Sequence, residues 1–254
     1  MQVFIISMLV CTIMILLLRK VAHRLDLMDC PGGRKQHQCP TPAVGGLAML
    51  FGVLAALLAD GSLHGNVAIL LGCSAMLVVL GVLDDKHSLS VPVRMMAQVF
   101  LVTVVIVDTG GTITHLGALI GKDISLGMFA VPFSVVAFVG GINSINMIDG
   151  MDGMAGKMAL ITMLGVAVIS YVAGNVDLLP LTWAMLGTLA GFLLLNSRVF
   201  VRRAWVFMGD SGSMWLGLVL VWFIVQLTQG NAPAEPAMVL WLLGIPLMDS
   251  VSVM

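Results

Sequence analysis

The sequence predicts an all-α fold, a polytopic membrane helix bundle of about nine transmembrane helices with its N-terminus outside and a small β-hairpin on the outer face. Of its 254 residues, 59% are hydrophobic and only 10% are charged, whereas soluble domains carry about 25% charged residues. The polar segments are short and separate long apolar runs. We therefore expect residues 1–254 to form a single integral membrane domain.

The apolar runs mark the expected helices. Most are close to the ~20 residues that a helix needs to cross the hydrocarbon core, and the shortest can recruit flanking residues. The runs cover residues 3–18, 44–59, 67–83, 91–107, 128–147, 154–173, 178–195, 213–227 and 237–248.

The basic residues predict how the bundle is oriented. Arg19, Lys20 and Arg24 follow the first run, the reverse of a cleavable signal peptide, so we expect an uncleaved helix with an outer N-terminus. If successive helices cross the membrane in opposite directions, 11 of the 12 Lys and Arg residues lie in the loops on one side and only Lys122 lies on the other. The positive-inside rule makes the first set cytoplasmic.

The one long outer loop, residues 109–127, is expected to contain the hairpin. Residues 112–114 and 123–125 alternate in polarity around a glycine-rich centre, which is typical of two short paired strands. Gly121-Lys122 lies here without the remaining residues of a phosphate-binding loop, so we reject that interpretation.

Residues 143–153 concentrate amides, carboxylates and glycines between two apolar runs. Asn143, Asn146, Asp149 and Asp152 recur every third residue. Each such step rotates ~60° away from one helix face, so one straight helix cannot align all four. We predict that one helix ends near Met147 and another begins near Asp152, with a joint that suits a phosphate and a hard cation. The alternative is a polar cap that closes two helices.

Asp84 and Asp85 end the third expected helix. Negative charge at a helix C-terminus opposes the macrodipole, so we expect a cationic group nearby. The alternative is a solvated loop with Lys86 as the partner.

Two basic loops predict contacts with phosphate groups. Lys35 and His37 lie in the first, and Arg202 and Arg203 lie in the second; guanidinium groups are fork-shaped phosphate donors. Anionic lipid headgroups are an alternative ligand. Asp210 then begins the next helix, either as an N-cap or beside a metal-bound diphosphate.

The acidic residues favour a hard cation. Twelve of the 13 are Asp, and eight of these fall on the inner side without clustered His or Cys, which favours Mg²⁺, or Mn²⁺, over zinc or copper. Carboxylates, a cation and basic side chains at a membrane surface suggest phosphoryl-type transfer with one lipid-bound substrate. The competing class is an ion-coupled transporter, which would carry its ionisable residues nearer the bilayer midplane. We expect no nucleic-acid partner.

Several motifs resemble the polyprenyl-phosphate N-acetylhexosamine-1-phosphate transferases. The first loop and the 143–153 segment look most similar to the undecaprenyl-phosphate N-acetylglucosamine branch of that family. The motifs are Lys35-x-His37, Pro42-x-Val44-Gly45-Gly46, Asp84-Asp85, Asn143-x-x-Asn146-x-x-Asp149-Gly150-x-Asp152-Gly153, Phe207-Met208-Gly209-Asp210-x-Gly212-Ser213 and Pro246-Leu247-Met248-Asp249.

The resemblance implies a reaction and a role for each matching residue. Undecaprenyl phosphate would attack the sugar-linked phosphate of a UDP-N-acetylhexosamine at the cytoplasmic face of a bacterial inner membrane, releasing UMP and starting a lipid-linked glycan of the O-antigen or common-antigen type. Asp210 would be the main Mg²⁺ ligand, and Asp85 would support it. Asp84 would act on the lipid phosphate, and Phe207 would stack on uracil. Asn143, Asn146, Asp149 and Asp152 would hold the nucleotide diphosphate, with Lys35, His37, Asn196, Arg202 and Arg203 as further substrate contacts and Asp249 as a supporting residue.

The chain departs from the family in one respect. Family members continue into a loop with a His-x-His-His cluster and further helices, whereas the last His here is His115. We therefore expect either a truncated product or a fragment of a longer protein, and an inactive remnant is an alternative to an active transferase. The hexosamine, the glycan pathway and a homodimeric assembly stay open.

Overall fold

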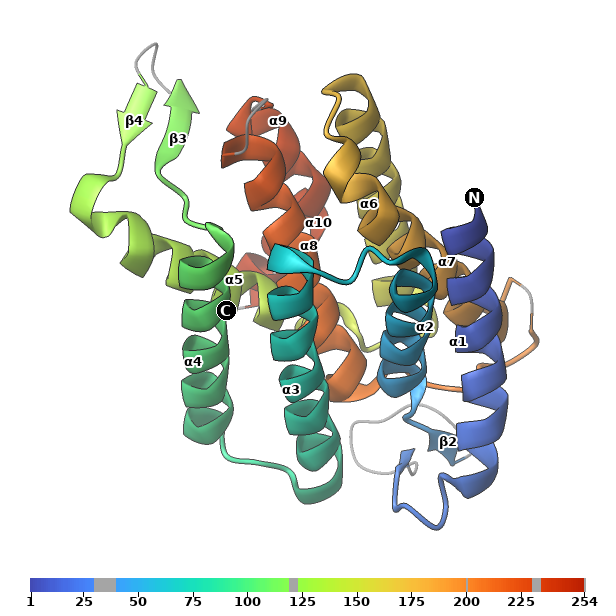
Figure 1. Cartoon of the computed structure of the whole chain (residues 1–254). Helices are drawn as coiled ribbons and strands as arrows, with labels where there is room; N and C mark the ends of the chain where they lie inside the picture. Colours follow the sequence, from blue (N-terminus) through green and yellow to red (C-terminus); the bar gives the residue numbers. More distant parts are fainter. Residues whose placement is uncertain (30–39, 119–122, 200, 230–233, 254) are drawn as a thin grey trace.

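The computed structural model describes residues 1–29, 40–118, 123–199, 201–229 and 234–253, and these residues form a bundle of helices with two small two-stranded sheets (Figure 1). The helices are α1 (Gln2–Val21), α2 (Gly45–Asp60), α3 (Gly65–His87), α4 (Val91–Thr109), α5 (Ala130–Ile148), α6 (Met154–Val172), α7 (Leu179–Asn196), α8 (Gly209–Gln229), α9 (Pro236–Leu240) and α10 (Gly244–Val253). Short 3₁₀ turns η1 (Gly127–Phe129), η2 (Val176–Leu178) and η3 (Trp241–Leu243) precede α5, α7 and α10.

The polytopic membrane bundle predicted from the sequence is confirmed. Within the described residues, seven helices are long and apolar enough to cross a membrane, and α2 is a shorter apolar helix of 16 residues. The ninth predicted run is not one continuous helix. It divides into α9, η3 and α10, with Gly244 and Pro246 at the start of α10, two residues that disfavour an uninterrupted helix.

Helix α8 forms the centre of the bundle, and every residue from 211 to 225 is buried. It packs against α2, α3, α5 and α6, and Figure 1 shows it between α3 and the α6–α7 pair. Glycines permit the closest approaches. A Cβ at Gly217 would lie 2.6 Å from the Ile142 Cα, and one at Gly81 would lie 2.3 Å from the Ser211 Cα. Such contacts between small residues are a common way for membrane helices to associate.

The small sheets lie at opposite ends of the bundle (Figure 1). The predicted hairpin is present as β3 (His115–Ala118) paired antiparallel with β4 (Asp123–Ser125), although its first strand begins three residues later than expected. The Gln229 side chain at the end of α8 secures it. The amide oxygen accepts the N–H of Thr114 at 3.0 Å, and the amide nitrogen donates to the His115 carbonyl at 2.9 Å. A second sheet pairs β1 (Met28–Asp29) with β2 (Thr41–Pro42).

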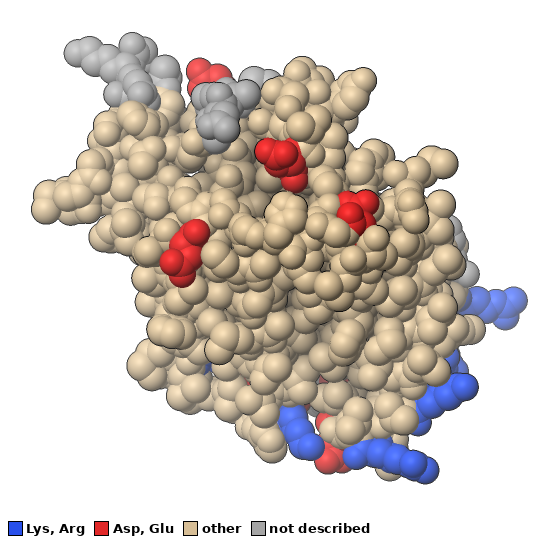
Figure 2. Space-filling model, in the orientation of Figure 1, with Lys and Arg blue, Asp and Glu red and all other residues tan. Residues whose placement is uncertain are grey.

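Charge is distributed unequally between the two ends of the bundle. On the face shown in Figure 2, the described Lys and Arg side chains lie in the lower half, whereas the upper half shows only acidic ones. In the matching view of Figure 1, the lower end is where α1 and α3 end and where α2 and α4 begin. The basic end therefore also contains the Asp84–Asp85 pair.

Candidate active site at the ends of four helices

The candidate site begins with a buried ion pair between α3 and α4. Asp84, in the last turn of α3, is only 5% exposed. Its Oδ2 accepts a hydrogen bond from Arg94 Nη1 at 2.7 Å, and its Oδ1 accepts the N–H of Leu89 at 2.8 Å. The cation expected beside this carboxylate is thus Arg94, ten residues later. Lys86, the local alternative, instead lies 3.4 Å from Asp26.

The neighbouring carboxylate, Asp85, contacts a different helix. Its two oxygens accept the backbone N–H groups of Asp210 at 3.0 Å and Ser211 at 3.4 Å, in the first turn of α8. Asp85 therefore lies near the C-terminus of α3, where a negative charge opposes the helix dipole. It also lies at the N-terminus of α8, where the dipole stabilises a negative charge. Gly209 makes this approach feasible, because it has a φ of +72° and a Cβ there would lie 2.6 Å from Asp85 Oδ2.

Asn146, near the end of α5, joins this cluster to α8. Its Nδ2 donates to Asp210 Oδ1 at 2.7 Å and to Ser213 Oγ at 2.9 Å. The other oxygen of Asp210 lies 3.9 Å from Arg94 Nη1. Asp210 is the second residue of α8 rather than the N-cap considered from the sequence. Side chains from α3, α4, α5 and α8 consequently meet around one carboxylate.

Asp149 adds a further carboxyl group between α5 and α6, outside the membrane-spanning segments. Burial raises the pKa of the Asp149 carboxyl well above its usual range, and the negative charges of Asp210 and Asp85 raise it further. A cation bound among these carboxylates would relieve their repulsion.

The joint between α5 and α6 lies where the sequence predicted it. Helix α5 ends at Ile148 and α6 begins at Met154. Gly153 precedes α6 with a φ of +74°, a conformation that suits glycine. Asp152 does not join the cluster around Asp210. Its Oδ2 accepts a hydrogen bond from Arg198 Nε at 2.7 Å, which links this joint to the α7–α8 loop.

The first-loop motif supports the start of α8 through backbone contacts. The Phe207 N–H donates to the Pro42 carbonyl at 2.8 Å, and its carbonyl accepts the Gly45 N–H at 2.9 Å. The Gly46 N–H donates to the Met208 carbonyl at 3.0 Å, and a Cβ at Gly46 would lie 2.3 Å from the Gly212 nitrogen. Two motifs that are distant in sequence are therefore adjacent in space.

Other residues selected from the sequence have different surroundings. Asn143 donates to Gln98 Oε1 at 2.8 Å, and Asn196 is buried and donates to the Val206 carbonyl at 2.7 Å. Arg202 and Arg203 are exposed in the α7–α8 loop, and Asp249 is exposed on α10. Lys35 and His37 lie outside the described residues.

The sequence did not identify Arg94 and Gln98 as partners of the site residues. Both lie in the apolar helix α4, where a single polar residue carries little signal. The available hint was their position four residues apart on one face of α4. Ser213 belongs to the motif that begins at Phe207, but no role was predicted for it, and here it accepts a hydrogen bond from Asn146.

The side-chain oxygen atoms around Asp210 are of the type that binds a hard cation. Within the described ranges, no three His, Cys, Asp or Glu side chains are close enough to hold a metal ion by themselves. Asp210 Oδ2, the spare lone pairs of Asp85 and the Asp149 carboxyl are all oxygen donors. Mg²⁺ typically binds one or two carboxylates and completes its octahedron with water and phosphate oxygens, so these residues fit it.

The fold and the site together define a polytopic membrane protein with carboxylate, amide and guanidinium groups gathered where helices end. Residues 67–228 match the glycosyl transferase family 4. The undecaprenyl-phosphate alpha-N-acetylglucosaminyl 1-phosphate transferase of Yersinia pestis is 34% identical over 238 residues, which are 93% of this chain and 65% of that protein. The proteins of the same name from Salmonella typhi and Escherichia coli strain K12 are 33% and 32% identical over 245 residues, 96% of this chain and 67% of each.

The chain belongs to the glycosyl transferase family 4. It spans about two thirds of the length of these relatives.

Proposed function

We propose that this chain carries the phosphoryl-transfer site of an enzyme that moves N-acetylglucosamine 1-phosphate from UDP-N-acetylglucosamine to undecaprenyl phosphate. An oxygen of the lipid phosphate would form a bond to the sugar-linked phosphorus, the bond from that phosphorus to the bridging oxygen would break, and UMP would leave. The product would begin a lipid-linked glycan of the O-antigen or common-antigen type. The names of the relatives support the transfer and its lipid acceptor.

The observation that carries the proposal is the meeting of four helix ends around Asp210. Phosphoryl transfer requires groups that position two phosphates and stabilise charge, with little covalent work for the protein. Arg94 lies between Asp84 and Asp210, where its guanidinium would also contact a phosphate oxygen. Asp84 would orient the lipid phosphate, and Asn146 would keep Asp210 in position.

Mg²⁺, or Mn²⁺, would be held mainly by Asp210, with Asp85 as the second carboxylate. When bound, the ion would offset the negative charge of the donor diphosphate and of the transition state. Asp149 lies close enough for the charge of Asp210 to raise its pKa, so its carboxyl would contact either the ion's water shell or the diphosphate.

The site would face the cytoplasm, because it lies at the end of the bundle where the basic side chains gather (Figure 2). UDP-sugars are polar and soluble, and the acceptor phosphate is anchored in the lipid. A site at helix ends would give both substrates access. We therefore infer a multi-pass protein of the bacterial inner membrane.

Release of UMP tests the proposal. The protein, purified in detergent, should release UMP from UDP-N-acetylglucosamine only when undecaprenyl phosphate and Mg²⁺ are both present. Asp210→Asn should lower the rate by roughly 10² or more, the order found when one stabilising group is removed from a transition state.

The matched control is Asp108→Asn, an exposed carboxylate of α4 at the opposite end of the bundle. This variant should keep the parental rate. Full activity of Asp210→Asn would refute the role given to Asp210, and UMP release without a lipid acceptor would refute the reaction.

A further inference from the structure

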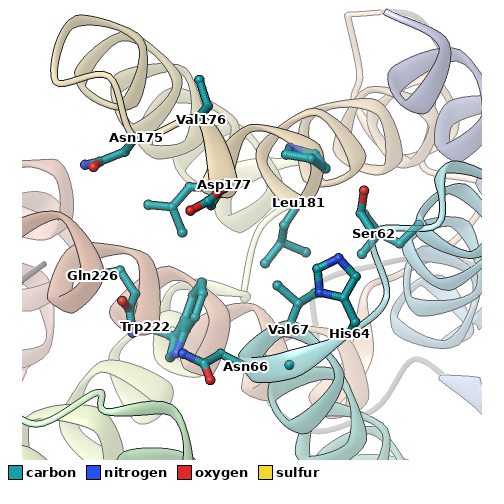
Figure 3. A pocket seen from close by; sticks show the side chains of 14 residues that line it. Ser62, His64, Asn66, Val67, Asn175, Val176, Asp177, Leu181, Trp222 and Gln226 are labelled. Carbon is teal, nitrogen blue, oxygen red and sulfur yellow. The ribbon is translucent and has the colours of Figure 1, made fainter. Parts of the chain in front are cut away.

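A cavity lies at the end of the bundle opposite Asp210. It has a volume of about 540 Å³, within the range of small-molecule sites. Four parts of the chain line it: the end of α2 with the loop after it, the start of α3, the η2–α7 segment and α8. Figure 3 shows side chains from these elements pointing toward a common space.

The polar side chains of this cavity have unused hydrogen-bonding capacity. His64 lies immediately before α3, Asp177 lies in η2, and Gln226 lies near the end of α8. Within the described part of the chain, none of these three side chains forms a hydrogen bond or an ion pair. In Figure 3, Asp177 and His64 extend toward the cavity from opposite sides. A ligand here would meet a carboxylate, an imidazole and an amide.

The apolar part of the cavity is already held in place. Trp222 is only 2% exposed and donates its Nε1 hydrogen to Thr109 Oγ1 at 3.0 Å. Asn66 donates to the Thr109 carbonyl at 3.1 Å. Val67 and Leu181 lie between His64 and Asp177 in Figure 3. Little conformational entropy of these side chains would therefore be lost when a ligand binds.

The lining indicates the chemical class of the ligand. None of the lining residues, all of them described, is Lys or Arg, so a phosphate would lack the cationic partner that such groups usually have. His64 and Gln226 both donate and accept hydrogen bonds, and Asp177, the only carboxylate among the lining residues, accepts them. This pattern suits hydroxyl groups, and the apolar walls suit the C–H faces of a sugar ring.

We propose that this cavity is a binding site for a neutral saccharide unit of a glycan. Asp177, His64 and Gln226 would hydrogen-bond its hydroxyl groups, and the partly exposed Val67 would pack against a ring face. Trp222 and Leu181 are buried and would support this wall of the cavity. Helix α3 separates this site from the Asp84–Asp85 pair by roughly 30 Å along its axis, at 1.5 Å per residue. The two sites are therefore distinct, and this proposal stands whether or not the chain transfers sugar phosphates.

Isothermal titration calorimetry on the purified protein in nanodiscs tests the saccharide site. Maltose, cellobiose and N,N′-diacetylchitobiose would be titrated to roughly 10 mM, a range that reveals weak sites. At least one should bind. Asp177→Asn should weaken that binding by roughly tenfold, the effect of losing a hydrogen bond to a charged group, and Gln226→Leu should also weaken it.

Two comparisons make the outcome decisive. Asp108→Asn, an exposed carboxylate outside the cavity at the same end of the bundle, should bind the saccharide as the parent does. Asp177 is exposed, so its Asn variant should keep the parental melting temperature. No binding by any of the three saccharides, equal binding by all variants, or binding of phosphoethanolamine in their place would overturn the proposal.

Discussion

The adjacent carboxylates Asp84 and Asp85 show how neighbouring residues take separate roles. Side chains of consecutive helix residues point ~100° apart, and here one meets Arg94 while the other meets the start of α8. The sequence predicted that a cationic partner would be needed. It could not identify Arg94, because that contact depends on the path of the α3–α4 loop, in which Ser88 adopts a φ of +50°.

Asp149 leads to a prediction at the residue scale. Asp149→Asn should raise the thermal stability of the protein at neutral pH in EDTA, because a carboxyl whose pKa rises on folding is ionised at a cost in the folded state. The gain should be absent below the unfolded pKa of Asp, about 4. It should grow as pH increases and level off above the raised folded pKa. Melting curves recorded from roughly pH 4 to 8 measure it.

Asp108→Asn serves again as the control, because that carboxyl is exposed and its replacement should leave the melting temperature nearly unchanged. A stability gain for Asp149→Asn that is constant with pH, or that shrinks as pH rises, would contradict the raised pKa. In an activity assay the same variant should lose function, since a buried charge that costs stability is typical of functional sites.

At the scale of the helix, the contact between α3 and α8 determines where Asp210 lies. Gly81 is the close-packed point of this contact, and Asp85, one turn later, receives the first N–H groups of α8. A helix start held by a carboxylate and by a close backbone contact has little freedom to shift. The position of Asp210 therefore depends on a glycine that carries no chemistry of its own.

Two glycine substitutions in α3 test this contact. Gly81→Ala would place a Cβ 2.3 Å from the Ser211 Cα, and overpacking of this kind costs about 1–3 kcal/mol. The variant should melt at a lower temperature and release UMP more slowly. Gly72→Ala is the matched control, because nothing lies within 4 Å of its Cβ and alanine favours a helix by up to ~1 kcal/mol. Equal melting temperatures for the two variants would argue against the close contact.

Helix boundaries were largely predictable from the sequence, and the reason is physical. In lipid, every backbone polar group must bond within its own segment, so long apolar runs become helices. The glycines and carboxylates of residues 149–153 mark the joint between α5 and α6 correctly. The break within residues 237–248 was missed, although Gly244 and Pro246 lie in this run, because the prediction rested on its continuous apolar character and did not weigh these two residues. Packing also contributes to the division. One such contact joins Thr162 Oγ1 to the Leu242 carbonyl at 2.7 Å.

At the scale of the whole molecule, the unequal charge of the two ends predicts a membrane orientation. In a variant without its four native cysteines, Asp108→Cys should react with a membrane-impermeant maleimide in intact cells. Lys86→Cys, at the basic end, should react only after the membrane is opened. Both positions are exposed, so a difference in reactivity reports the side of the membrane. Labelling of Lys86→Cys alone in intact cells would reverse the proposed topology.

The sequence predicted only in part which site residues lie close together. The alternation of helices correctly suggested that Asp84, Asp85, Asp149 and Asp210 share one end of the bundle. It could not show which of them touch, nor that Asp152 instead pairs with Arg198, because those contacts depend on how helices pack side by side. The cavity lined by His64 and Asp177 had no sequence signal, since its residues come from four separate segments.

The burial of α8 has a consequence for how the bundle can rearrange. Every residue from 211 to 225 is buried, and both ends of the helix are bonded to distant parts of the chain. Asp85 of α3 accepts the N–H of Asp210 at the start of α8, and Gln229 at its end accepts the N–H of Thr114 beside the hairpin. Displacing such a helix would require most of its neighbours to repack at once. If the proposed transfer takes place, the opening that admits a lipid tail or releases a nucleotide should come from rearrangement of the outer helices, while α8 keeps its position.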